Sequence, residues 1–319
     1  MITPPTPSGC IALTGGSGFV GGHVLRRLVA AGWRVRALTR RLDALPELGT
    51  AVTPILGDLA NRDAIAELLS DAQAVVHCAG LVAALNAAEF HRVNTKGTED
   101  LLRAATGGGA APRFILVSSL AAREPQLSPY ARSKRAAEDC LQRSGASLDW
   151  QVLRPPVVYG PGDRATLPLF RQFARGLVLR PAGEGRFSML YVEDLAAAVV
   201  ALLAAAAPRA EVMELDDGTT GGYGWDEVLA AAERQFGRRI RAVPVPRALQ
   251  RLAAAFGTVG ATVTGRPPIL SQGKVNEIAH PDWTCRNRLL VDCISWRPAV
   301  GLDEGFSRTF AWYKAAGWL

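Results

Sequence analysis

The sequence predicts an α/β fold of the doubly wound type, with helices on both faces of a mostly parallel sheet, and a smaller, mostly helical C-terminal domain. Three observations support this prediction. The first half of the chain alternates short apolar runs with helical patterns, as parallel α/β domains do. A glycine-rich turn follows the first apolar run directly. The chain has 319 residues, which is long enough for a sheet domain and a second, smaller unit.

The glycine-rich turn, TGGSGFVG at 14–21, follows the apolar run at 10–13 and leads into a helical pattern at 19–31. A buried strand, a glycine turn and a helix in this order are the context in which a Rossmann fold binds a dinucleotide. Glycines permit the tight turn, the close approach of a pyrophosphate and the packing of the helix, whose first N–H groups face the phosphates. A purely structural turn is the alternative. The residues expected to bind the dinucleotide here are Gly15, Ser17, Gly18, Phe19 and Gly21.

The second expected strand, at 34–38, is followed by Thr39-Arg40-Arg41. NAD-binding folds usually carry Asp or Glu near this point to hold the ribose 2′-hydroxyl. A guanidinium can instead pair with the 2′-phosphate of NADP through two hydrogen bonds. We therefore predict NADP(H) in preference to NAD(H), with Arg40 as the main partner of the phosphate and Arg41 as the second. The alternative is that one of these arginines only faces water.

A tyrosine and a lysine lie four residues apart in SPYARSK, at 128–134. Ser128 is a good N-cap and Pro129 suits the first helical position, so Tyr130 and Lys134 are expected on one face of a helix. A nearby ammonium favours the phenolate and lowers the pKa of a phenol from its ordinary value of about 10. The pair is therefore predicted to exchange a proton at working pH. Taken alone, Tyr-x-x-x-Lys is short enough to be a chance exposed pair.

The order and spacing of several motifs resemble those of the extended short-chain dehydrogenase/reductases, which include nucleotide-sugar epimerases, dihydroflavonol reductases and 3β-hydroxysteroid dehydrogenases. The resemblance covers nearly the whole chain and implies a dinucleotide-dependent enzyme. Besides the glycine turn and the Tyr-x-x-x-Lys pair, it rests on the segments 77–80, 93–98, 117–119, 153–162, 191–196, 296–305 and 312–313.

The resemblance implies a role for each residue of the expected catalytic set. Tyr130 would be the acid/base, and Lys134 would hold the nicotinamide ribose and tune Tyr130. Ser119 would bind the substrate oxygen, with Ser118 as the fallback, and Asn94 would position a relay water or brace the active-site helix. Further cofactor-binding residues implied by the resemblance are Asp58, Leu59, Ala79, Gly80, Pro155 and Val157, together with Tyr130 and Lys134.

The resemblance and the composition also suggest domain boundaries. We expect the cofactor domain to take 1–160 and about 186–216, and the substrate domain to take about 161–185 and 217–319. The second half contains more proline and irregular sequence than the first. Relatives commonly pair through the helices that contain Asn94 and Tyr130, so a homodimer is expected. Residues available for that contact, or for the core, are Ala136, Ala137 and Leu141.

Charge and composition argue against several other classes of protein. The net charge of +7 would suit nucleic-acid binding, but the arginines are scattered and no basic run exceeds two residues. We find no Cys-x-x-Cys or His-x-x-x-His spacing, so no metal site is expected and the four histidines are interpreted as structural. The segment 1–9 lacks the apolar core of a signal peptide, and the longest apolar stretch, 195–207, is too short to span a bilayer. These features predict a cytoplasmic enzyme.

The sequence says less about the substrate. Nucleotide-sugar enzymes commonly carry an arginine four residues before the position of Tyr191 to bind a diphosphate, and this chain has Phe187 there. Arg186 would point to the other face if the segment is a strand. The segment 81–85 (LVAAL) is apolar, which favours a hydrophobic substrate, although ordinary packing explains it equally well. The segment 245–263 is rich in apolar residues, so it is expected either to form plain core or to cap an apolar pocket, with plain core favoured. Candidates for the wall of such a pocket are Val157, Tyr159 and Met189.

Three hypotheses follow. The first is an NADP(H)-dependent reductase of a ketone or aldehyde, or the reverse alcohol dehydrogenase. The second is a nucleotide-sugar epimerase or dehydratase that keeps its cofactor bound, against which Phe187 argues. The third is a non-catalytic cofactor-binding or assembly protein, against which the intact Ser, Tyr and Lys set argues.

Overall fold

The computed structural model describes residues 9–108, 111–144, 148–205, 210–268, 270–286 and 289–319. Two sequence predictions concern residues beyond these ranges. The segment 1–9, interpreted as lacking a signal peptide, lies outside the described residues except for Gly9. The apolar stretch 195–207 is described only as far as residue 205.

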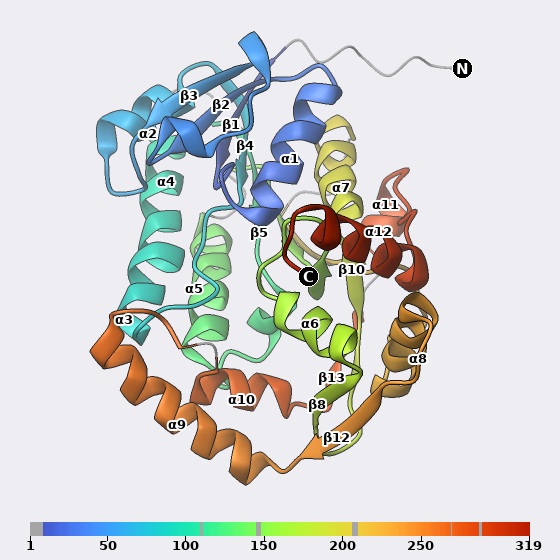
Figure 1. Cartoon of the computed structure of the whole chain (residues 1–319). Coiled ribbons are helices and arrows are strands. Elements are labelled where there is room, and N and C mark those ends of the chain that lie inside the picture. The colour runs from blue at the N-terminus through green and yellow to red at the C-terminus, as the bar shows by residue number, and fades with distance from the viewer. Residues whose placement is uncertain (1–8, 109–110, 145–147, 206–209, 269, 287–288) are drawn as a thin grey trace.

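A seven-stranded parallel sheet forms the centre of the larger part of the molecule (Figure 1). Its strand order is β11-β6-β5-β4-β1-β2-β3, so the chain starts in the middle and winds outward in both directions. This arrangement is the Rossmann-like α/β fold that the sequence predicted. The strands are β1 (Cys10–Thr14), β2 (Arg34–Thr39), β3 (Val52–Leu56), β4 (Ala72–His77), β5 (Arg113–Val117), β6 (Trp150–Arg154) and β11 (Glu211–Glu214).

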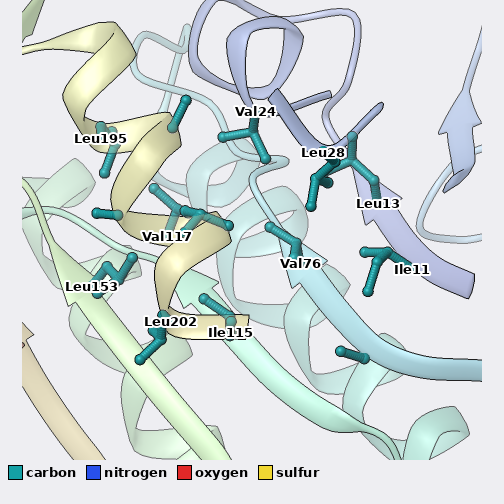
Figure 2. Packing of buried hydrophobic residues seen from close by; sticks show 14 of the residues in the cluster. Ile11, Leu13, Val24, Leu28, Val76, Ile115, Val117, Leu153, Leu195 and Leu202 are labelled. Carbon is teal, nitrogen blue, oxygen red and sulfur yellow. The ribbon is translucent and has the colours of Figure 1, made fainter. Parts of the chain in front are cut away.

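Helices cover both faces of the sheet. On one face, α1 (Phe19–Ala30) and α7 (Val192–Ala204) pack against each other and against the strands, with Leu28 and Leu195 completely buried (Figure 2). On the other face, a second core cluster includes α2 (Arg62–Leu69), α4 (Gly97–Thr106) and α5 (Pro129–Arg143). Strands that are covered on both faces explain the continuous apolar runs in the sequence.

The smaller part has its own aromatic core, built mainly from α6 (Leu167–Arg175), α8 (Trp225–Phe236) and α12 (Leu302–Ala315). Three two-stranded parallel ribbons accompany it: β7 (Val157–Tyr159) with β10 (Met189–Tyr191), β8 (Leu177–Pro181) with β12 (Arg241–Val245), and β9 (Arg186–Phe187) with β13 (Asp282–Trp283). The other helices here are α9 (Arg247–Thr264), α10 (Gln272–Ile278) and α11 (Leu289–Cys293).

One segment near the C-terminus returns to the sheet. Helix α11 contacts β11, and Leu290, Ile294 and Trp296 belong to the core cluster formed by α1 and α7. The boundaries expected from the sequence assign these residues to the substrate domain, so those boundaries do not follow the packing at this point. None of the helices in the described part of the chain combines the length and the apolar character that crossing a bilayer requires.

Candidate active site

Two glycines of the turn after β1 meet close contacts that no other residue would fit. Gly15 has φ +76°, and a Cβ added to it would lie 2.6 Å from the backbone nitrogen of Ala79. A Cβ at Gly21 would lie 2.0 Å from the backbone oxygen of Gly15. The first contact brings the turn against the end of β4, and the second packs α1 onto the turn. Both positions therefore require glycine.

The start of α1 is open to an anion. Gly18 is its N-cap and has no side chain to bond the first N–H groups, and the first turn contains no acidic residue. The first N–H groups of a helix have no partner within the helix, and they attract negative charge. Ser17 is exposed and Phe19 is half-buried at this end. The backbone here therefore fits the pyrophosphate of a dinucleotide.

A hollow of about 600 Å³ adjoins the glycine turn. It is also lined by the loop 44–46, by Pro161 and by Trp312. Neither Tyr130 nor Lys134 lines it, so this hollow is not the place where a carbonyl group would meet them.

The two arginines after β2 differ in their partners. Arg41 makes two hydrogen bonds to the carboxylate of Asp43, at 3.0 and 2.7 Å. Arg40 is exposed, and no carboxylate of the described residues pairs with it. Arg40 is thus the more available cation for a 2′-phosphate, whereas Arg41 would first have to leave Asp43.

The expected adenine-binding residues follow β3. Asp58 is exposed, and its side chain accepts a hydrogen bond from the backbone nitrogen of Ala60 at 2.9 Å. Leu59 packs on Gly97, where an added Cβ would lie 2.7 Å from the Leu59 Cδ1 atom. The carboxylate of Asp58 is therefore accessible, and Leu59 anchors its segment on α4.

Helix α5 presents Tyr130 as the sequence predicted. The Ser128 hydroxyl caps the helix by accepting a hydrogen bond from the nitrogen of Ala131 at 2.9 Å, and Pro129 is the first helical residue. The Ser119 side chain, which follows the end of β5, lies close enough to the Tyr130 phenol to lower its pKa. The phenol and the hydroxyl expected to bind one carbonyl oxygen thus lie together.

Ser118, the fallback for Ser119, has another partner. It is buried and donates a hydrogen bond to Glu138 at 2.5 Å. The same carboxylate is held by the guanidinium of Arg154, at 3.0 Å from Nε. Ser118 therefore faces a buried ion pair beneath the site, whereas Ser119 faces Tyr130.

Lys134 is buried, and its ammonium donates to the backbone oxygen of Val117 at 2.9 Å. Burial lowers the pKa of Lys134 to about 8, against the opposing influence of Glu138. Gly80 lies beside it, since a Cβ added there would be 3.6 Å from the ammonium nitrogen. The lysine thus stands between the ends of β4 and β5, beneath the expected path of the cofactor.

The pKa of Tyr130 differs from the sequence prediction. Burial raises it to about 12, an effect that the nearby Ser119 side chain opposes and the negative charge of Glu277 reinforces. The sequence predicts that the ammonium of Lys134 lowers this pKa. That prediction is wrong because the ammonium is directed to Val117 and desolvation of the phenol dominates. The phenol of Tyr130 accordingly keeps its proton at neutral pH.

Asn94 braces the site from within the π-helical turn His91–Lys96. Its amide nitrogen donates to the oxygen of Leu81 at 3.0 Å and to the hydroxyl of Ser133 at 2.9 Å. Its amide oxygen accepts from the nitrogen of Leu81 at 2.7 Å. Ser133 in turn donates to the backbone oxygen of Tyr130. Of the two roles suggested for Asn94, these contacts support the one in which it braces the active-site helix.

A profile of the NAD dependent epimerase/dehydratase family matches residues 11–215, more than half of the chain. The chain belongs to this family. Its fold and motifs accordingly confirm the resemblance to the extended short-chain dehydrogenase/reductases.

Two relatives and one solved structure illustrate the similarity. Ceramide reductase of Caulobacter vibrioides is 39% identical over 313 residues, which cover 98% of this chain and 96% of that protein. A 4-hydroxy-2-methyl-3-oxo-4-farnesyl-3,4-dihydroquinoline-1-oxide ketoreductase of Stigmatella aurantiaca is 34% identical over 227 residues, covering 65% and 67%. The UDP-glucose 4-epimerase of Thermus thermophilus, solved with NAD, has a TM-score of 0.72 at 24% identity, with 96% and 99% covered. At that identity the last comparison shows the fold alone.

The position expected to hold an arginine in nucleotide-sugar members of the epimerase/dehydratase family is occupied by an aromatic side chain. Phe187 packs on Trp225, with ring centroids 5.8 Å apart. The neighbouring Arg186 donates to the backbone oxygens of Gly221 and Gly222 and pairs with Glu227. Arg186 is thus committed to the protein itself and does not replace the missing arginine.

After β6, the last two expected cofactor contacts differ in exposure. Pro155 is buried, and its backbone oxygen accepts from the nitrogen of Leu120, next to Ser119. Val157 is 40% exposed. The segment after β6 is therefore fixed to the segment that carries Ser119, with Val157 open to a ligand.

Sequence reasoning missed a buried network that connects the glycine turn with Asn94. The Thr14 hydroxyl accepts from the nitrogen of Ala79 and lies 2.6 Å from Nδ1 of His77, while Nε2 of His77 lies 2.9 Å from the hydroxyl of Thr98. Thr98 donates to the backbone oxygen of Asn94. Since Thr98 donates onward, His77 donates to it through Nε2 and accepts from Thr14 through Nδ1. Burial lowers the pKa of His77 to about 3, so the ring stays neutral.

Proposed function

We propose that the chain is an NADP(H)-dependent oxidoreductase that interconverts a ketone or aldehyde and an alcohol. The observation that carries the proposal is the proximity of Tyr130 to Ser119, at the end of β5 and beside the buried Lys134. This arrangement provides a proton donor and a second hydroxyl for one oxygen atom. The glycine turn, where a Cβ at Gly15 or Gly21 would clash, fits a dinucleotide that reaches these side chains.

In the proposed reduction, the bound nicotinamide would supply the hydride for the carbonyl carbon. Ser119 holds the carbonyl oxygen by a hydrogen bond. As the C=O double bond opens, Tyr130 breaks its O–H bond and gives the proton to that oxygen, which completes the alcohol. Solvent then returns a proton to the phenolate. The pKa of about 12 suits this step, because Tyr130 holds its proton at neutral pH and gives it to a more basic alkoxide.

For the cofactor, we propose NADP(H) over NAD(H). Arg40 supports this proposal, because it is exposed near the end of β2 and no carboxylate of the described residues neutralises it. The only acidic side chain within four residues after β2, Asp43, is paired with Arg41. Arg40, Arg41 and Asp43 are the only charged residues among the first four after β2. Apart from them, this segment offers no charged partner to the ribose hydroxyl of NAD or to the 2′-phosphate of NADP.

For the substrate, we propose a ketone on a lipid with long hydrocarbon chains. The relative that covers nearly all of this chain is named a ceramide reductase, and the second acts on a farnesyl compound according to its name. The segment 81–85 supports the proposal: Asn94 holds Leu81 at the site, while Val82 and Leu85 are exposed. An apolar segment that the fold leaves uncovered beside the site suits a hydrocarbon chain.

The test is consumption of NADPH by the purified protein with a panel of ketones. The panel runs from short water-soluble ketones to a ceramide whose secondary alcohol is replaced by a ketone, dispersed in detergent. We expect turnover that rises with chain length. An epimerase or dehydratase would instead purify with a bound cofactor that is never consumed, and a non-catalytic protein would bind NADPH without turnover. Either result would reject the reductase.

We also propose a cytoplasmic location and a homodimer. All five cysteines are free thiols, which suits a reducing compartment. In the proposed homodimer, the two subunits would contact each other through the outer surfaces of α4 and α5. Ala137 and Leu141 are completely or almost completely buried in the core of the chain, so they are not available for it. Sedimentation analysis of the purified protein tests the oligomeric state.

A further inference from the structure

Helix α9 carries an apolar stripe that no part of the described chain covers. Leu249, Leu252 and Phe256 are 56%, 55% and 70% exposed. Their spacing of three and four residues puts them on one face of the helix. Single exposed leucines are ordinary on a protein surface, but three large apolar side chains in line mark a contact surface.

A different face of α9 attaches the helix to the protein. Ala254 and Ala261 are buried, and Gln272 donates to the backbone oxygen of Arg251 at 2.7 Å. Arg247 donates to the side chain of Asn276 in α10 at 3.0 Å. Helix α9 is therefore fixed along α10 at the lower edge of the molecule in Figure 1, and the stripe does not belong to its protein contacts.

The apolar stripe continues toward a neighbouring ribbon. Strand β12 leads directly into α9 and pairs with β8, on which Leu177 and Leu179 are 45% and 57% exposed. These two leucines are two residues apart, so they lie on one face of the ribbon. Five of the large exposed apolar side chains thus occur on α9 and on β8, the strand that pairs with the strand leading into α9.

The stretch of sequence that contains α9 carries only positive charges. Between Glu233 and Glu277 the chain contains eight arginines and lysines and no aspartate or glutamate. Arg251, within α9, and Arg266, just beyond its C-terminal end, are exposed. An apolar stripe on a helix with basic residues and no acidic ones is the pattern that binds the surface of an anionic membrane.

We propose that α9 docks on the surface of a membrane that contains anionic lipids, with Leu249, Leu252 and Phe256 inserted among the acyl chains. The purpose of the docking rests on the proposed function. Helix α10 joins α9 to the active-site helix, because a Cβ added at Gly273 would lie 2.7 Å from the Cβ of Ser128. The stripe is therefore two elements away from Tyr130, and docking would bring the site close to a lipid substrate in the bilayer.

The first experiment measures co-sedimentation of the full chain with vesicles of phosphatidylcholine that contain phosphatidylglycerol. We expect binding that is strong at low salt, weaker at high salt and weak on phosphatidylcholine alone. The triple variant Leu249→Ser, Leu252→Ser, Phe256→Ser should lose about tenfold or more in partitioning. The double variant Arg251→Gln, Arg266→Gln should partition about fivefold less for each charge removed, and only on the anionic vesicles. As a matched control, Leu56→Ser, at an equally exposed leucine of β3, should bind like the wild type.

Three results would overturn the proposal. The first is a wild-type protein that does not bind the anionic vesicles, and the second is a triple variant that binds them unchanged. The third is a triple variant that changes the oligomeric state in solution while vesicles have no effect, which would assign the stripe to a second copy of the chain. Vesicle binding requires no turnover, so its result is independent of the reductase assay. If both hold, the triple variant should reduce a vesicle-bound ketone more slowly, relative to a short soluble ketone, than the wild type does.

Discussion

The ammonium nitrogen of Lys134 lies 2.9 Å from the backbone oxygen of Val117, at the carboxyl end of β5. The lysine is thus anchored to the sheet and not to Tyr130, which precedes it by one helical turn. Its burial makes the charged form costly and lowers its pKa to about 8. Of the two residues, Lys134 is therefore the one that titrates near working pH, while Tyr130 keeps its proton.

The rate of reduction should accordingly fall as the pH rises through about 8. Above that value Lys134 loses the charge that would hold the cofactor ribose, whereas Tyr130 stays protonated until about pH 12. We expect kcat/KM for a soluble ketone to show this alkaline limb, and Lys134→Met to show a low rate without it. A wild-type profile that stays flat up to pH 10 would contradict the assignment.

Replacing Tyr130 by phenylalanine removes the proton donor and little else. Since general acid catalysis contributes about 10²–10⁴-fold, turnover should fall by at least that range. Binding of NADPH, followed by its fluorescence, should remain close to that of the wild type. Unchanged turnover in Tyr130→Phe would remove the mechanism.

The neighbouring serines provide a matched pair. Ser119→Ala removes the hydroxyl next to Tyr130 and should lower kcat by about a hundredfold, as loss of one donor to a developing oxyanion does. Ser118→Ala removes a donor to the buried Glu138 and should cost about 1 kcal/mol of unfolding free energy with little change in kcat. Kinetics and thermal unfolding of both variants separate the roles. The reverse pattern would make Ser118 the substrate-binding residue.

Arg40→Ala should weaken NADPH about ten- to hundredfold and leave NADH nearly unchanged, because only NADPH has the 2′-phosphate. Arg41→Ala is the matched comparison and should have a smaller effect, since Arg41 is bound to Asp43. Dissociation constants for both nucleotides give the answer. Equal losses for NADPH and NADH in Arg40→Ala would reject the specificity for NADP(H).

His77 should make the fold sensitive to acid. Its folded pKa of about 3 lies below the ordinary 6.5, so between these values the unfolded chain binds a proton that the folded chain does not. Stability should therefore fall as the pH drops from 6.5 toward 3, by about 1.4 kcal/mol for each pH unit at most. Urea unfolding across this range should show a flatter dependence in His77→Gln. The exposed His91→Gln should behave like the wild type.

The sequence was sufficient to predict the fold, because its signals are local. The turn at 14–21 requires glycine for contacts within a few residues, as the 2.0 Å approach of a Cβ at Gly21 to the Gly15 oxygen shows. The cap formed by Ser128 and Pro129 also lies within one turn of the helix that it starts. These features can be read from spacing alone.

Only the tertiary structure decided the electrostatics of the site. The partner of Ser118 is Glu138, the partner of Thr14 is His77, 63 residues away, and the charge next to Tyr130 comes from Glu277 near the other end of the chain. Sequence spacing placed Lys134 near Tyr130 but could not show that its ammonium turns to Val117. The pKa of a buried group depends on desolvation and on charges brought together by folding, and neither is a property of neighbouring residues in the sequence.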